Sequence, residues 1–214
     1  MTRFNAVILD VDSTLSGIEG IDWLAAQRGK EVADWSATLT ERAMRGEIPI
    51  EAVYGERMRA VRPTRKEVDQ LGREYINRIA PGARETLAAL KTASVQLVMV
   101  SGGLREAISP LAAVLGVEER SLYAVSVFFD EGGDYASFDE ASPLTRQTGK
   151  QTTVAGLRLK GPILAVGDGM TDSEMKPVVD SFAAFTGFTR RAPVIERADF
   201  VVENFDQLRE LVLQ

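Results

Sequence analysis

Two residue types that carry much of enzyme chemistry are absent from this chain of 214 residues: it contains no cysteine and no histidine. The absence of cysteine excludes disulfides, thiol nucleophiles and cysteine-ligated zinc or iron–sulfur sites. The absence of histidine excludes a Ser-His-Asp triad, a histidine-ligated metal and an imidazole base. Acid–base and metal chemistry must therefore use carboxylates, lysine, tyrosine, serine or threonine.

The sequence also lacks a long apolar run and an excess of positive charge. Its 25 Lys and Arg residues against 31 Asp and Glu residues leave a net charge of −6, so we expect neither nucleic acid nor a membrane as partner. No apolar run approaches the length of a membrane span, and the run nearest the N-terminus stops at Asp10, too short for a signal peptide. These features favour a cytoplasmic location.

Short apolar runs rich in branched side chains recur along the chain and are typical of strands buried on both faces. They lie, the three strongest first, at residues 4–9, 95–100, 162–166, 122–129, 182–185 and 199–202. Helical patterns lie between them, as at residues 104–115, where Gly116 is a candidate C-cap. The alternation predicts an α/β fold with a doubly wound, mostly parallel sheet.

Residues 20–80 interrupt this alternation, because they contain helical patterns and no convincing strand. Behind Pro49, five apolar residues between positions 50 and 61 fall on one helical face, and Thr64 to Glu67 form a capping-box pattern. We therefore expect a helical cap at residues 19–79, inserted into a core of residues 1–18 and 80–214. Residues 125–138 predict a hairpin around two glycines.

Polar residues follow the three strongest strands of the predicted sheet. Asp10 and Asp12 follow the first, Ser101 the second, and Asp168 and Asp172 the third. If the strands are parallel neighbours, these side chains converge on one rim of the sheet. Clustered carboxylates repel one another unless a cation lies among them, and oxygen ligands without histidine or cysteine indicate Mg²⁺.

Each of these residues alone has an ordinary structural interpretation. A single aspartate at a strand end is more often a cap or turn former than a catalytic residue, and Ser-Gly-Gly alone is a loop. Three such endings on three buried strands favour a site. Alternation along a strand would let Asp10 and Asp12 point the same way, so that one attacks while the other moves a proton.

The motifs resemble a known superfamily. Asp10-Val-Asp12-Ser-Thr14, Ser101, Lys150 and the GDGMTD segment at residues 167–172 are similar to the four motifs of the haloacid dehalogenase superfamily. Residues 19–25 (EGIDWLA), 40–46 (TERAMRG), 101–103 (SGG) and 138–140 (FDE) further resemble the phosphoserine phosphatase family. The resemblance extends from about residue 5 to residue 210 and implies a Rossmann-like core with a helical cap.

The resemblance implies roles for the core motifs. Asp10 matches a nucleophile that becomes an aspartyl phosphate, and Asp12 matches a general acid that later activates water. Mg²⁺ would be held by the Asp10 carboxylate, the Asp12 backbone carbonyl and Asp168. The phosphoryl oxygens would be bound by Ser101, Gly102 and Lys150. Two further residues would orient the site from nearby, namely Thr171 and Asp172.

In the cap, the resemblance implies that Glu19 binds the substrate ammonium and Arg57 its carboxylate, while Met44 and the Arg45 backbone line the pocket. A zwitterionic amino acid needs one anionic and one cationic contact, which this pair would supply. Ile50 stands where the family usually carries Phe. The implied activity is Mg²⁺-dependent hydrolysis of O-phosphoserine to serine and phosphate, a step of serine biosynthesis.

Two further interpretations stay open at this point. The same chemistry could serve another small phosphometabolite, or transfer the phosphoryl group to another alcohol. A receiver-like signalling domain also combines aspartates, a hydroxyl residue, a lysine and Mg²⁺, although the inserted helices and the nucleophile on the first strand argue against it. The sequence does not determine the oligomeric state.

Overall fold

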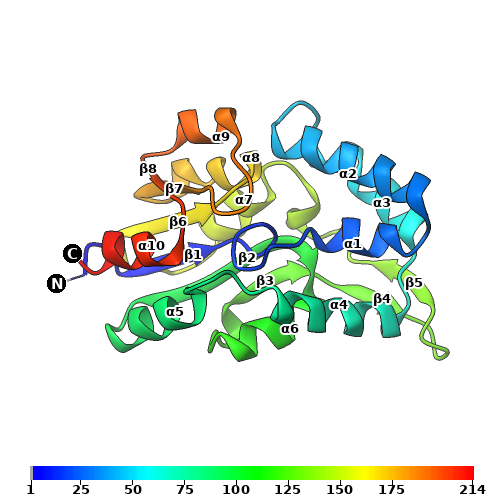
Figure 1. Cartoon of the computed structure of the whole chain (residues 1–214), viewed down its shortest axis with the longest axis horizontal. Helices are drawn as coiled ribbons and strands as arrows, with labels where there is room; N and C mark the ends of the chain where they lie inside the picture. The colour runs from blue at the N-terminus through cyan, green and yellow to red at the C-terminus, as the bar shows by residue number, and fades with distance from the viewer. Residues whose placement is uncertain (1) are drawn as a thin grey trace.

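A six-stranded parallel sheet forms the centre of the molecule. The computed structural model describes residues 2–214, and the strand order of the sheet is β3-β2-β1-β6-β7-β8 (Figure 1). The strands are β1 (Ala6–Leu9), β2 (Gln96–Leu104), β3 (Leu122–Val125), β6 (Ile163–Gly167), β7 (Ser181–Phe185) and β8 (Phe200–Val202). All four residues of the central strand β1 are buried, as expected for a strand covered on both faces.

Helices cover both faces of this sheet and confirm the predicted α/β fold. One face carries α5 (Ala83–Thr92), α6 (Arg105–Val114) and α10 (Phe205–Val212). The other carries α7 (Gly149–Ala155), α8 (Met170–Ser173) and α9 (Ala192–Arg197) (Figure 1). Of the helices in residues 2–214, none has the length and apolar character that crossing a bilayer requires.

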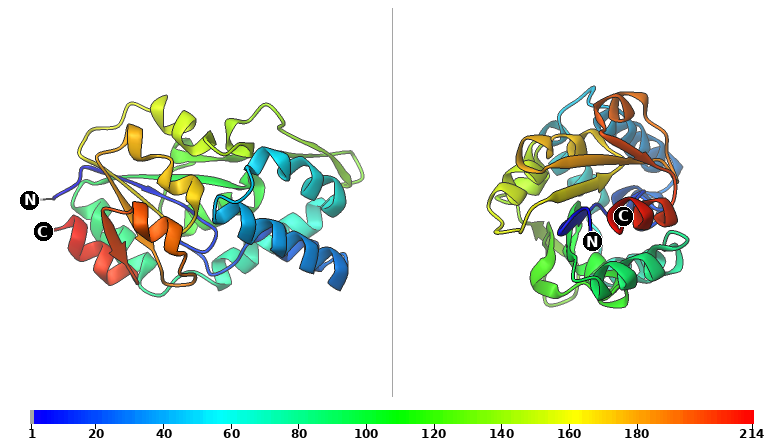
Figure 2. Two further views of the ribbon diagram at one scale, coloured as in Figure 1. Left: turned by 90° about the horizontal axis from the view of Figure 1, so that it is seen from above. Right: turned by 90° about the vertical axis from the view of Figure 1, so that its left-hand side faces the viewer.

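Four α-helices and a short 3-10 turn occupy the interval expected to form a cap. They are α1 (Gly20–Ala26), α2 (Lys30–Met44), η1 (Ile50–Ala52), α3 (Tyr54–Val61) and α4 (Arg65–Asn77). Figures 1 and 2 show α1, α2 and α3 grouped at the end of the molecule opposite both chain termini. Helix α4 packs against α6 of the core so closely that a Cβ on Gly72 would lie 3.1 Å from the Ala107 carbonyl oxygen. Because α4 belongs to the predicted cap by sequence but packs closely on the core, the boundary of the cap at residues 19–79 stays a prediction.

Three expectations about single elements need correction. The helical face expected over residues 50–61 is divided, because Val53 has φ −126° and separates η1 from α3. The apolar run at residues 122–129 forms two strands. Of these, β3 joins the main sheet, whereas β4 (Val127–Phe129) pairs antiparallel with β5 (Tyr135–Phe138) and so forms the predicted hairpin. The second strand continues past Ser101 to Leu104, with an irregular register.

The register of the sheet brings three strand ends to one rim. Leu9 at the end of β1 pairs with Met99 of β2 on one side and with Val166 of β6 on the other. The residues that follow β1 and β6 therefore leave the sheet beside the part of β2 that carries Ser101. Because parallel strands all end at the same edge, Asp10 emerges between the segments that carry Ser101 and Asp168.

A bidentate ion pair joins the cap helices at the start of α4. The Arg28 Nη1 and Nη2 atoms donate to the two carboxylate oxygens of Glu67, each at 2.6 Å. Glu67 also completes the predicted capping box with Thr64. The hydrogen bonds from Arg28 lower the pKa of Glu67 from 4.5 to about 2. The charged carboxylate therefore stabilises the fold at neutral pH.

Glu67→Gln keeps a capping side chain but removes the charge, so we expect it to lower the free energy of unfolding by about 1 kcal/mol at pH 7. Because the folded pKa is depressed, the stabilisation is complete above pH 4.5 and is lost as pH falls towards 2. Urea unfolding at pH 7, 5, 4 and 3 measures the difference.

Asp34→Asn is the matched control, because Asp34 pairs with Lys30 on an exposed helix surface. We expect that variant to lie within about 0.5 kcal/mol of the parent. A Glu67→Gln difference that stays constant over this pH range would contradict the assignment.

Candidate active site

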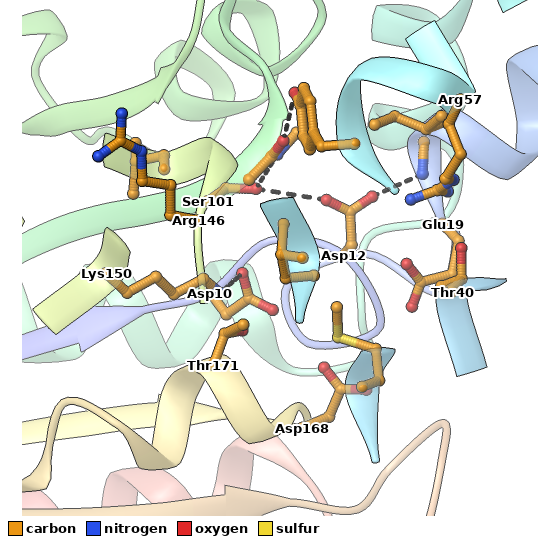
Figure 3. A pocket seen from close by; sticks show the side chains of 18 residues that line it. Asp10, Asp12, Glu19, Thr40, Arg57, Ser101, Arg146, Lys150, Asp168 and Thr171 are labelled. Carbon is orange, nitrogen blue, oxygen red and sulfur yellow. Dashed lines mark hydrogen bonds and ion pairs between the residues drawn. The ribbon is translucent and has the colours of Figure 1, made fainter. Parts of the chain in front are cut away.

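A pocket lies between the carboxyl rim of the sheet and the helices α1, α2 and α3. Its walls combine core residues such as Asp10, Ser101 and Asp168 with cap residues such as Glu19 and Arg57 (Figure 3). The two groups come from segments far apart in the sequence. The pocket is therefore a product of the sheet register and of the helices inserted after β1.

Asp10 is buried at the end of β1 and is paired with a lysine. Lys150, the second residue of α7, places its Nζ 2.5 Å from Asp10 Oδ1 and 2.6 Å from Asp172 Oδ1. Burial raises the pKa of Asp10 to about 7; Asp172 adds to the rise and Lys150 opposes it. Burial alone lowers the pKa of Lys150, but the two carboxylates more than offset this and leave it raised. Lys150 is therefore held as a cation between two acids.

Asp12 lies two residues further along and is held by groups from the cap. Its Oδ1 accepts hydrogen bonds from the Gly20 backbone N–H at 2.6 Å and from the Tyr75 hydroxyl at 2.7 Å. Ser101 Oγ donates to its Oδ2 at 3.3 Å (Figure 3). Removal from bulk water raises the pKa of Asp12, although the bond from Tyr75 opposes this. A raised pKa suits a group that must donate a proton.

Asp168 follows β6 and is paired with a cation that the sequence motifs do not contain. Its carboxylate contacts the Arg191 guanidinium, whose Nη2 also lies 3.1 Å from Glu41 of α2. Thr14 Oγ1 lies 3.5 Å from the other oxygen of Asp168. Burial and the charge of Glu19 raise the pKa of Asp168 well above its ordinary value, while Arg191 opposes the shift.

Three of these acids cluster as a metal site requires. Carboxylate oxygens of Asp10, Asp168 and Asp172 lie within 4.8 Å of one another, and all three residues are buried. Oxygen donors without nitrogen or sulfur suit a hard divalent cation. The donor set therefore fits a metal ion, and the raised pKa values of Asp10 and Asp168 indicate that positive charge would keep these two acids ionised.

The cap side of the pocket carries an acid and an arginine. Glu19 accepts a hydrogen bond from Ser13 Oγ at 2.7 Å, and removal from bulk water together with Asp12 raises its pKa to about 8. Arg57 is buried, with its Nη2 2.8 Å from Asp22 and its Nε 3.1 Å from Ser36 Oγ. Within residues 2–214, no hydrogen bond or ion pair engages Arg57 Nη1.

Ten of the twelve residues named from the sequence line this pocket, and two do not. Asp172 lies behind the lining and contacts Lys150 and the Gly169 N–H. Arg45 lies at the surface, and its guanidinium pairs with Glu41 at 2.6 Å. The placement brings most candidates together but does not test their roles, which stay predictions.

Sequence reasoning missed several residues that complete the site. Arg191 has no motif around it and reaches Asp168 only through the fold. Tyr75 and Tyr54 fit an apolar helical stripe, so their hydroxyl groups gave no signal of contacts with Asp12 and with the Gly102 carbonyl. Arg146 lies four residues before Lys150 and lines the pocket. Its position close in sequence to a candidate phosphate-binding lysine was the available signal, although Arg146 has an extended backbone and lies before α7.

Comparisons with known proteins agree on one family. The sequence model of the haloacid dehalogenase-like hydrolases matches residues 7–176. Phosphoserine phosphatase from Homo sapiens is 35% identical over 207 residues, covering 95% of this chain and 91% of that protein. A phosphoserine phosphohydrolase-like protein from Francisella tularensis superposes with a TM-score of 0.88 at 24% identity, covering 98% and 100%. A substrate-bound phosphoserine phosphatase superposes with a TM-score of 0.78 at 25% identity, covering 97% and 96%.

Gly149 immediately precedes Lys150 and lies against the preceding loop. A Cβ at this position would lie 1.9 Å from the Pro143 carbonyl oxygen and 2.9 Å from the Leu144 Cα. Backbone atoms cannot move aside as a flexible side chain does. Only glycine therefore lets α7 begin close enough to the rim to place Lys150 beside Asp10.

We expect Gly149→Ala to lower the free energy of unfolding by about 2–3 kcal/mol, because the added methyl group forces the backbone apart. Urea unfolding measures this. Gly156→Ala, at the other end of α7, is the control: its Cβ would be 3.4 Å from the Thr153 carbonyl oxygen, so a change below about 0.5 kcal/mol is expected. Equal stability of the two variants would contradict the packing argument.

Proposed function

Because the chain belongs to the phosphoserine phosphatases of the haloacid dehalogenase-like hydrolase family, we propose that it hydrolyses O-phosphoserine to serine and phosphate as a step of serine biosynthesis. The reaction proceeds through an aspartyl phosphate. The substrate is thus a small phosphate ester, and the enzyme is a phosphatase. The division of labour among its residues is part of the proposal.

One observation carries the proposal most directly. Asp10 and Asp12 share a pocket with the phosphate-binding candidates Ser101 and Lys150. The same pocket contains Glu19 and Arg57, an anionic and a cationic partner for the ammonium and carboxylate groups of an amino acid. A phosphate ester without an amino acid would leave this second pair unused. The combination therefore supports an amino-acid ester over a simple sugar phosphate.

In the first step, an Asp10 carboxylate oxygen attacks phosphorus and forms an O–P bond while the ester P–O bond breaks. Asp12 donates its proton to the departing serine oxygen, which leaves as a hydroxyl group. Lys150 opposes the repulsion between the attacking carboxylate and the phosphate dianion. Its ammonium has three N–H donors, two of which contact Asp10 and Asp172, so one remains for a phosphoryl oxygen.

In the second step, the Asp12 carboxylate accepts a proton from water as the water oxygen bonds to phosphorus. The bond between phosphorus and Asp10 breaks, inorganic phosphate leaves, and both aspartates regain their starting protonation states. Asp12 must therefore hold a proton in one step and release it before the next. Its raised pKa and its hydrogen bonds from Tyr75 and Gly20 support this exchange.

The metal proposed for the acid cluster is Mg²⁺. Asp10, Asp168 and the Asp12 backbone carbonyl would hold it, with Asp172 close by. The cluster of three buried carboxylates supports a hard divalent cation at this place. Bound there, the ion would supply positive charge to the phosphoryl oxygens. Arg191 contacts Asp168 and would help to orient that carboxylate.

Substrate recognition rests on the two charged groups in the cap. Glu19 would bind the ammonium of phosphoserine, and Arg57 would bind its carboxylate with the Nη1 atom that Asp22 and Ser36 leave available. Met44 and Ile50 add apolar surface to the same pocket. Asp22 and Ser36 fix the guanidinium in place, so it needs little reorganisation when the substrate enters.

The direct test of the nucleophile is Asp10→Asn, which preserves shape but removes the attacking charge. We expect kcat on O-phosphoserine to fall at least about 1,000-fold, because covalent catalysis is lost. Phosphate release in the presence of MgCl₂ measures the effect, and thermal unfolding checks that the variant is folded.

Asp69→Asn serves as the control for this test, because Asp69 is exposed on α4 and should retain full turnover. Retained activity in Asp10→Asn would refute the nucleophile assignment. If the parent enzyme turns over simple sugar phosphates as fast as phosphoserine, the proposed substrate is wrong.

Arg57→Ala tests recognition of the carboxylate. We expect kcat/KM to fall about 30- to 150-fold on O-phosphoserine, equivalent to the loss of a charged hydrogen bond of about 2–3 kcal/mol. The loss should be under about threefold on phosphoethanolamine, which keeps the ammonium but lacks the carboxylate. The ratio of the two losses cancels any general damage that follows from leaving Asp22 unpaired.

Arg59→Ala removes the same charge from the same helix at an exposed position. It should leave both substrates within about twofold of the parent. Equal losses on the two substrates in Arg57→Ala would mean that Arg57 does not bind the substrate carboxylate.

A further inference from the structure

Tyr54 connects a cap helix to the end of the second strand. Its hydroxyl, on the first residue of α3, donates to the Gly102 carbonyl oxygen at 2.9 Å. The ring is 4% exposed and lies against Phe138, with the ring centres 5.3 Å apart. The ring therefore packs on core residues, while the hydroxyl makes a specific contact with the segment that follows Ser101.

The peptide unit between Gly102 and Gly103 is held at both of its polar ends. Its carbonyl accepts the hydrogen bond from Tyr54, and its N–H donates to Ser101 Oγ at 2.9 Å. The register of β2 is irregular between Val100 and Leu104, so regular pairing does not determine the orientation of this peptide. The two hydrogen bonds fix the orientation of the peptide instead.

From this peptide the hydrogen bonds continue to Asp12. Ser101 Oγ accepts from Gly103 and donates to Asp12 Oδ2 at 3.3 Å (Figure 3). The other oxygen of Asp12 accepts from Tyr75 and from Gly20. The chain of contacts therefore begins and ends on the helices inserted after β1 and passes through the acid that would move the proton.

We propose that Tyr54 is a positioning residue: through the Gly102–Gly103 peptide, it orients the Ser101 hydroxyl that donates to Asp12. The inference rests on the proposed function for its kinetic consequences. Tyr54 also lines the pocket, but its hydroxyl proton is donated to the Gly102 carbonyl, so the hydroxyl acts on the reaction through Ser101.

Tyr54→Phe removes the hydroxyl and keeps the buried ring. We expect kcat on O-phosphoserine to fall about fivefold, the loss that corresponds to one neutral hydrogen bond. KM should stay within about twofold, because the contacts to the amino acid are unchanged. Tyr135→Phe is the control, since its ring is buried on β5 and its hydroxyl has no hydrogen-bond partner within residues 2–214; kcat and KM should match the parent.

A double-mutant cycle tests whether the effect passes through Ser101. In a Ser101→Ala background, Tyr54→Phe should lower the single-turnover rate by less than about 1.5-fold, because the hydroxyl that it orients is gone. Three outcomes would overturn the proposal: a full fivefold loss of rate in the Ser101→Ala background, no loss when Tyr54→Phe is made in the parent, or an equal loss in Tyr135→Phe.

Amide hydrogen exchange gives a readout that does not need turnover. Tyr54→Phe should speed exchange about fivefold in the peptide that spans residues 101–104 and leave the central strands unchanged, whereas a general loss of stability would speed exchange everywhere. If the parent fails to hydrolyse phosphoserine, the proposed function fails while this measurement still tests the positioning. Unchanged exchange at residues 101–104 would contradict the role of Tyr54 even in an active enzyme.

Discussion

Buried negative charge at the end of the sheet is the constraint on which the rest of this structure depends. Asp10, Asp168 and Asp172 are removed from water within a few ångströms of one another. Carboxylates in that situation take up protons or recruit cations. Lys150 and Arg191 neutralise part of this charge through ion pairs, and each lies on a separate segment of the core. A bound metal ion would supply the remaining positive charge and would also attract the phosphate dianion of the substrate.

Cap and core share the task of balancing these charges. Arg191 contacts both Asp168 of the core and Glu41 of α2, while Asp12 accepts hydrogen bonds from α1 and α4. The inserted helices are therefore part of the electrostatic environment of the reacting groups, in addition to enclosing the pocket. The substrate, which the cap would recognise, and the nucleophile, which the core carries, would meet in the pocket where cap and core make these contacts.

Local patterns predicted the parts of the fold that depend on local chemistry. The buried strands, the helices between them, the hairpin and the capping box at Thr64 all follow from side-chain periodicity or from capping hydrogen bonds. The same patterns misjudged the helix break at Val53 and the division of residues 122–129 into two strands. Those outcomes depend on which partner each segment finds in space, and periodicity does not carry that information.

For the site, the order of residues alone determined which chemistry is available. Without cysteine or histidine, and with aspartates after two buried strands and a serine after a third, the chain is restricted to carboxylate, lysine and metal chemistry at one rim. Only the tertiary structure decided which side chains complete that chemistry. Arg191 reaches Asp168 across 23 residues, and Tyr54 reaches Gly102 across 48. Both contacts arise from packing between distant segments, and no spacing along the chain encodes the direction in which a buried arginine or a buried tyrosine will point.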